Sequence, residues 1–171
     1  MASWIVTQRD FTAAAFEEVE KRVGHERAAH VLLKAAQAGA FSTNDLAAAL
    51  TSAWTGDGKV SSMLSLESWR FLFTKAGYAQ DGVHAERPTK PMRLYRGATV
   101  EGKHGMSWTS DLDTARFFTI PTDGDEGTIW TATFEPEHLL AHITARDEHE
   151  YVVDPEVLTS SLVEVEEHTA A

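Results

Sequence analysis

The hydrophobic period of this 171-residue chain changes partway along, and the change limits the folds that the chain can adopt. In residues 1–78 apolar side chains recur every three or four residues, which is the spacing of amphipathic helices. In residues 92–167 they form short runs rich in β-branched and aromatic residues, which favour strands. Residues 79–91 contain Gly82, Pro88 and Pro91 and fit neither period, so they predict a connector. Helices followed by strands predict an α+β fold rather than alternating β-α units.

The helical part, residues 1–78, predicts helices over Asp10–Val23 and Glu26–Ala38, a third that follows the cap hydroxyls of Ser42-Thr43-Asn44-Asp45, and a fourth that begins around Ser65. The acidic and basic run 17–22 predicts a solvated helix face. The side chains expected to face inward are, helix by helix, Phe16, Val19 and Val23; Ala28, Val31, Leu32 and Ala35; Leu46, Leu50 and Trp54; and Trp69, Leu72, Phe73 and Ala76.

Residues 92–167 predict a small mixed or antiparallel β core with one inserted helix. The helix is expected over Asp111–Thr119, capped by Ser110 or Asp111, with Leu112, Ala115 and Phe118 facing inward. We expect the N-terminal helical segment to pack on this core as one compact unit. The predicted strands are Met92–Arg96, Gly127–Phe134, Ala141–Ala145, His149–Val153 and Leu162–Glu166.

The amino-acid composition limits the kinds of partner that the protein can bind and the cellular compartment in which it is expected. The chain has no cysteine, so disulfides, thiol nucleophiles and cysteine-bearing zinc sites are excluded. A net charge of -11 disfavours nucleic acid and anionic membranes, because both attract clustered Lys and Arg; it suits a basic protein partner, or it serves solubility alone. No basic region precedes a long apolar run, and no apolar stretch approaches about 18 residues. We therefore expect a soluble cytoplasmic protein with no membrane partner.

Arg96 stands at the end of the first predicted strand, in Leu94-Tyr95-Arg96-Gly97. A guanidinium is planar and matches two phosphate oxygens, and a glycine beside it lets a ligand approach the backbone closely. The pattern predicts an anion site at this strand end. The alternative is that Arg96 makes an ion pair at the surface.

Ser107-Trp108-Thr109-Ser110 places two hydroxyls, those of Ser107 and Thr109, on one side of an extended segment. Two hydroxyls on one face can hold a ribose or orient a carboxylate. The alternative is a hydroxyl-rich turn that caps the next helix, a part that we expect Ser110 to play in either case. Trp108 falls on the other side, where a core position is expected.

Glu148-His149-Glu150 precedes the apolar run Tyr151-Val152-Val153, so two carboxylates at i and i+2 are expected on one face at the mouth of a buried strand. A fixed carboxylate there suits cleavage of an N-glycosidic bond, because it offsets the positive charge that develops on the sugar. The alternative, in a chain this acidic, is a solvated face.

The order of these pieces resembles the arginine–serine–glutamate class of ADP-ribosyltransferases over residues 92–166, a little under half of the chain. The resemblance implies an ADP-ribosyltransferase-type core and NAD as co-substrate. It implies that Arg96 holds the NAD phosphates, Ser107 sets the ribose and the glutamate, Glu150 acts as the catalytic acid, and Glu148 engages an acceptor guanidinium. The implied NAD-binding residues are Arg96, Gly97, Ser107, Trp108, Thr109 and Phe118; a helix aromatic such as Phe118 is, however, more often part of the core.

The function expected from this resemblance is NAD-dependent mono-ADP-ribosylation of a protein side chain, arginine by preference, with release of nicotinamide. Small acidic chains of this type also resemble reading frames of bacteriophages and prophages, which makes a host protein the expected acceptor. Two alternatives stay open: an NAD glycohydrolase, and an inactive module of the same fold that blocks a basic partner. No metal is expected, because His138 and His142 lie in a segment that should run into a strand.

Overall fold

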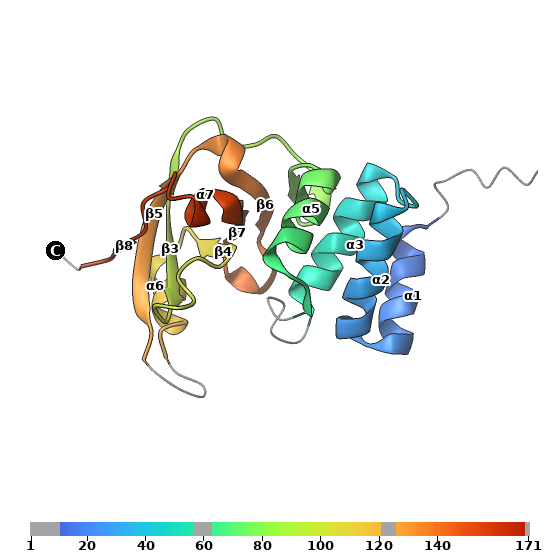
Figure 1. The fold of residues 1–171 in the computed structure, drawn as a ribbon, viewed down its shortest axis with the longest axis horizontal. Helices are drawn as coiled ribbons and strands as arrows, with labels where there is room; N and C mark the ends of the chain where they lie inside the picture. Colours follow the sequence, from blue (N-terminus) through green and yellow to red (C-terminus); the bar gives the residue numbers. More distant parts are fainter. Residues whose placement is uncertain (1–10, 57–62, 121–125, 170–171) are drawn as a thin grey trace, which may run out of the picture. The chain divides into compact units, whose positions relative to one another are not determined.

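The computed structural model describes residues 11–56, 63–120 and 126–169, apart from the side chain of Arg146. The chain divides into two compact units, Met1–Gly77 with Gly82–His84, and Tyr78–Asp81 with Ala85–Ala171. The first unit is helical and the second holds a mixed sheet (Figure 1). The predicted α+β class, with helices N-terminal to the sheet, is therefore confirmed.

The helical unit is built from α1 (Ala13–Val23), α2 (His25–Gln37), α3 (Thr43–Thr55) and α5 (Leu66–Ala76). The predicted helix starts are confirmed: the hydroxyl of Ser42, in the predicted cap segment, and that of Ser65 each accept a hydrogen bond from a backbone N–H three residues on. Asp10, the predicted start of the first helix, lies outside the described residues. The predicted inward residues of α3 and α5 are buried, and Trp54 packs edge-to-face on Trp69 and Phe73. These two helices thus follow the predicted pattern.

The buried face of α2 differs from the prediction. Ala29 and Ala36 are fully buried, whereas Val31 is exposed and Ala35 only half-buried. Helices α1 and α3 both contact α2, and small alanine side chains let neighbouring helix backbones approach closely. The apolar pattern alone indicated a face rotated toward the larger valine, and that part of the prediction was wrong.

The predicted solvated face of residues 17–22 was wrong at Glu20. Its side chain is buried, where Ser52 donates a hydrogen bond of 2.7 Å to Oε2 and His25 Nδ1 lies 3.4 Å from Oε1. A buried carboxylate persists only with polar partners, and α3 supplies one of them. Glu18 and Lys21 form an exposed pair, as the prediction required.

Residues 79–91 are not simply a connector. Asp81 and Gly82 have φ of 50° and 79° and form a tight turn between β1 (Ala79–Gln80) and β2 (Val83–His84). Strand β1 pairs in parallel with β6, with Ala79 opposite Ala141. The strands were missed because each is only two residues long and the partner of β1 is distant in sequence.

In the second unit the strands lie in the order β1-β6-β7-β4-β3-β5-β8, and every pair except β1–β6 is antiparallel. The bounds are β3 (Met92–Ala98), β4 (Ser107–Thr109), β5 (Thr128–Phe134), β6 (Leu139–Ile143), β7 (Glu150–Val153) and β8 (Glu166–Glu167). The last strand begins four residues later than the predicted Leu162. A helix that was not predicted, α7 (Pro155–Thr159), starts at an Asp154 cap with proline at its first position.

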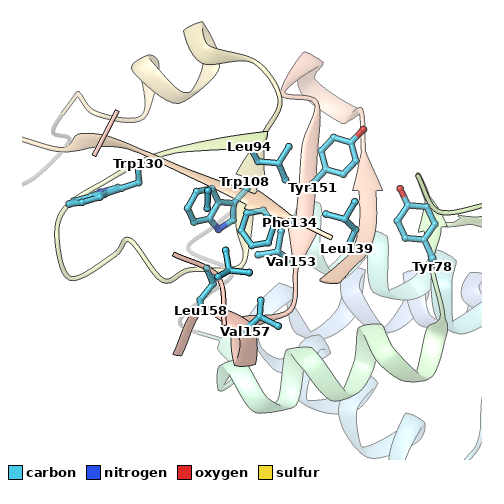
Figure 2. Close-up of a cluster of buried hydrophobic side chains, with 12 residues drawn as sticks. Tyr78, Leu94, Trp108, Trp130, Phe134, Leu139, Tyr151, Val153, Val157 and Leu158 are labelled. Atoms are coloured by element: carbon cyan, nitrogen blue, oxygen red, sulfur yellow. The ribbon is translucent and has the colours of Figure 1, made fainter. Parts of the chain in front are cut away.

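One apolar cluster of this unit gathers buried side chains from β3, β4, β5, β6 and β7 (Figure 2). Trp108 is 1% exposed and packs edge-to-face on Phe134, with ring centroids 5.1 Å apart. Val157 and Leu158 of α7 join the same cluster. The predicted core position of Trp108 is confirmed, and by alternation its neighbours Ser107 and Thr109 lie on the opposite face.

Candidate functional site

A cleft of about 510 Å³, including the solvent at its mouth, opens beside β3, β4 and the start of β7. Helix α6 (Leu112–Phe117) forms one wall through Thr114 and Ala115. The structure brings every residue of the predicted site to this cleft, although they span more than fifty positions of the chain. These residues are Arg96, Gly97, Ser107, Trp108, Thr109, Phe118, Glu148 and Glu150.

Strand register explains the convergence of Ser107, Thr109 and Glu150. Strand β4 runs between β3 and β7, with Thr109 opposite both Tyr95 and Glu150, and Ser107 opposite Val152. Residues directly opposite each other in antiparallel strands share a face of the sheet. Ser107, Thr109 and Glu150 therefore project from the same face, away from the core that contains the ring of Trp108.

The two acidic residues reach the cleft in different ways. Glu150 is the first residue of β7 and only 5% exposed, so the sheet fixes its direction. Glu148 precedes the strand, at the end of the 3-10 helix η2 (Ala145–Asp147), with φ -83° and ψ -12°. His149 between them has φ 43°. Strand alternation therefore does not align the two carboxylates, and that premise of the prediction was wrong, yet both line the cleft.

The hydroxyl of Thr109 ties this acidic segment to α6. It donates a hydrogen bond of 2.7 Å to the carbonyl oxygen of Glu148 and accepts one of 3.0 Å from the backbone N–H of Asp111. The carboxylate of Asp111 caps α6, which confirms one of the two predicted caps; Ser110 does not play the capping part expected of it. The same hydroxyl thus positions the backbone on both sides of the cleft.

Arg96 is anchored within the β3–β4 connection. Its Nε donates to the carbonyl oxygen of Gly102 at 2.9 Å and its Nη1 to that of Ser107 at 2.6 Å. A Cβ on Gly105 would stand 2.4 Å from Nη2, so a larger residue there would displace the guanidinium from its present position. The bonds fix the backbone of Ser107 at the start of β4 and bring the positive charge to the cleft.

Burial lowers the pKa of Arg96 to about 10, and the negative charge of Glu150 opposes that shift. At neutral pH the guanidinium is therefore still positively charged. A desolvated cation interacts more strongly with an anion than a cation in water does. The electrostatics of the cleft combine this one cation with the carboxylates of Glu148 and Glu150.

Packing against α6 also requires glycine at position 97, in addition to the predicted close approach of a ligand to the backbone. A Cβ there would stand 2.0 Å from the carbonyl oxygen of Ala115 and 2.9 Å from backbone atoms of Phe118 and Thr119. Helix α6 therefore approaches β3 at a distance that no larger residue permits. Phe118, predicted to face inward, is half exposed at the cleft rim, because the space under the helix holds only the alanine.

Asp81 is a residue of this region that sequence reasoning missed. Its carboxylate accepts hydrogen bonds from the backbone N–H and the hydroxyl of Thr144, at 2.7 and 2.8 Å. Asp147 and His149, just beyond, both have positive φ, a conformation that costs energy in residues other than glycine. Asp81 fixes one end of this strained segment and Thr109 the other. The turn at Asp81 was visible in the sequence, but its partner 63 residues away was not.

Within residues 11–56, 63–120 and 126–169, no group of three or more His, Asp or Glu side chains is arranged to hold a metal ion. His142 lies on β6, as expected, and stacks on the ring of Tyr151 at 4.3 Å. No helix in the described part of the chain has the length and hydropathy to cross a membrane.

Comparisons of the chain with protein-family models, with curated proteins and with solved structures found no match.

Proposed function

We propose that this protein is an NAD-dependent mono-ADP-ribosyltransferase that modifies a protein side chain, arginine by preference, and releases nicotinamide. The observation that supports the proposal is that Arg96, Ser107, Glu148 and Glu150 border one cleft. The resemblance to the arginine–serine–glutamate class names these residues from the sequence alone. Ser107 and Glu150 share a face of the sheet through the register of β4 and β7, which the resemblance does not contain.

The chemistry assigned to the cleft is a substitution at the ribose carbon that carries nicotinamide. The carbon–nitrogen bond breaks, its electron pair leaves with nicotinamide, and the sugar gains oxocarbenium character. The carboxylate of Glu150 offsets that charge from a position with little exposure to water. The acceptor nitrogen then bonds to the same carbon and loses a proton to water. Arg96 supplies the positive charge for the NAD phosphates, and Ser107 orients the ribose.

The decisive experiment measures turnover. The protein is incubated with NAD and arginine-containing peptides, and nicotinamide release and peptide labelling are both quantified. Glu150→Gln keeps the size of the side chain and removes its charge, so we expect both rates to fall by about 100-fold or more. Glu166→Gln on exposed β8 is the matched control and should leave both rates unchanged. Equal turnover by wild type and Glu150→Gln would remove the proposed role.

The position of Glu148 off the strand favours keeping NAD hydrolysis as a second candidate, because water replaces the acceptor if this carboxylate does not hold a guanidinium. The two activities separate in the same assay. Hydrolysis consumes NAD with no peptide present and is insensitive to Glu148→Gln. Transfer requires the peptide and falls in that variant.

A further inference from the structure

Three of the four residues at positions 117–120 are large, apolar and exposed. Phe117 is 68% exposed, Phe118 48% and Ile120 66%. We call these three residues the α6 patch. Single exposed apolar side chains are ordinary on a protein surface, but a contiguous group marks a binding surface more often.

The packing of α6 explains why these side chains stay outside. The helix buries Ala115 against Gly97, and the two backbones are too close for anything larger between them. Phe117 and Phe118 point elsewhere on the helix and contact each other edge-to-face, with centroids 5.5 Å apart. The close approach of α6 to β3 thus leaves no space beneath the helix for the aromatic rings.

The backbone of the patch is ordered by its own hydrogen bonds. The N–H of Thr119 donates to Arg116, that of Ile120 to Phe117, and that of Gly127 to the carbonyl oxygen of Thr119. A surface whose backbone is already fixed loses little conformational entropy when a partner binds. Exposed aromatic side chains on such a backbone are typical of interface residues that contribute strongly to affinity.

The position of the patch indicates its occupant. Phe118 is both a member of the patch and a wall of the cleft, so the patch continues the rim of the cleft. The cleft also contains the carboxylates of Glu148 and Glu150, and the whole chain carries a net charge of -11. A partner that presents a cationic side chain to the cleft and an apolar side chain beside it would match both surfaces.

We propose that the α6 patch is a docking surface for the acceptor, and that it selects an arginine flanked by large apolar residues. This inference rests on the proposed transferase activity, since it assumes that the arginine enters the cleft to be modified. It adds a rule of sequence preference for the acceptor that the activity itself does not imply.

The test uses two synthetic peptides that each contain one arginine, flanked in one by glycine and serine and in the other by leucine and phenylalanine. We expect wild type to label the apolar peptide with a kcat/KM roughly 10-fold higher or more. In the double variant Phe117→Ser with Ile120→Ser, that preference should disappear while the rate with the glycine-serine peptide is unchanged. The two substituted residues do not line the cleft.

Leu162→Ser is the matched control, because Leu162 is 75% exposed in the same unit and lies away from this cleft. It should keep the full preference for the apolar peptide. The docking surface is overturned if wild type labels both peptides with equal kcat/KM. It is also overturned if the double variant still prefers the apolar peptide. The double variant can also keep the melting temperature of wild type and lose its rate with both peptides. That result overturns the docking surface too, because the α6 patch would then be needed for the reaction and not for choosing the peptide. If wild type does not turn over NAD with either peptide, the proposed function fails, and this inference with it.

Discussion

Replacing Gly97 by alanine should show how strongly the cleft depends on the contact between α6 and β3. The added Cβ would stand 2.0 Å from the carbonyl oxygen of Ala115 and 2.9 Å from two further backbone atoms. An ordinary contact needs roughly 3.5 Å, so α6 would have to withdraw by about 1.5 Å. No side chain can rotate away, because all three obstructing atoms belong to the backbone.

The expected cost of Gly97→Ala follows from two opposing effects. Overpacking of this kind costs ~1–3 kcal/mol. Alanine in a strand regains ~0.5–1 kcal/mol relative to glycine, because the unfolded chain has less freedom to lose. We therefore expect the free energy of unfolding to fall by about 1–2 kcal/mol. Any NAD-induced rise in the melting temperature should also shrink, because Ala115 forms a wall of the cleft.

Urea unfolding followed by circular dichroism measures the effect, and Gly102→Ala provides the control. At Gly102 the nearest heavy atom to an added Cβ is a side-chain methyl at 3.3 Å, so that variant should stay within ~0.5 kcal/mol of wild type. A Gly97→Ala protein as stable as the Gly102→Ala protein would show that the close approach of α6 does not limit the side chain here.

Three further predictions concern the hydrogen bonds and titration of the same unit. Arg96→Lys removes the fork that bonds two carbonyls, so we expect a loss of ~1–3 kcal/mol in urea unfolding and faster proteolysis of the segment before Ser107. Thr109→Val removes the hydrogen bond to the carbonyl of Glu148; we expect a loss of about 1–2 kcal/mol and a lower kcat, whereas Thr109→Ser should restore both. Burial raises the pKa of Tyr78 to about 12, so folding favours its protonated form, and the stability present below pH 10 is lost as pH rises toward 12. That loss is roughly 2–3 kcal/mol in wild type and absent from Tyr78→Phe when unfolding is measured across this range; equal pH profiles would contradict the assignment.

Sequence reasoning succeeded where the determining interactions are local. Ser42 and Ser65 cap helices by bonding a backbone N–H only three residues away, and both starts were predicted. The inward face of α3 followed from the spacing of Leu46, Leu50 and Trp54. Sequence reasoning failed where a residue distant in the chain determines the environment of a side chain. Glu20 is an example, because it is buried where Ser52 on another helix donates a hydrogen bond to its carboxylate.

The candidate site shows the same division. The order of the motifs around Arg96, Ser107 and Glu150, and the family resemblance it carries, named them as candidate site residues, and all three line one cleft. The positive φ of His149, which removes Glu148 from the strand, left no signal in the sequence, since histidine does not favour that conformation as glycine does. The exposure of Phe118 could not be foreseen either, because it depends on how closely α6 approaches β3.

By itself, the sequence determined where the longer helices and strands form, because period, caps and β-branched runs act over a few residues; the short elements β1, β2 and α7 were missed. It also determined that the chain is acidic and free of cysteine. Only the tertiary structure decided that Thr109 lies opposite Glu150, that Arg96 is held by carbonyl groups beside them, and that Asp81 reaches Thr144. Strand pairing joins residues whose separation along the chain is not encoded in either partner, so register and the cleft it creates emerge only when the sheet is assembled.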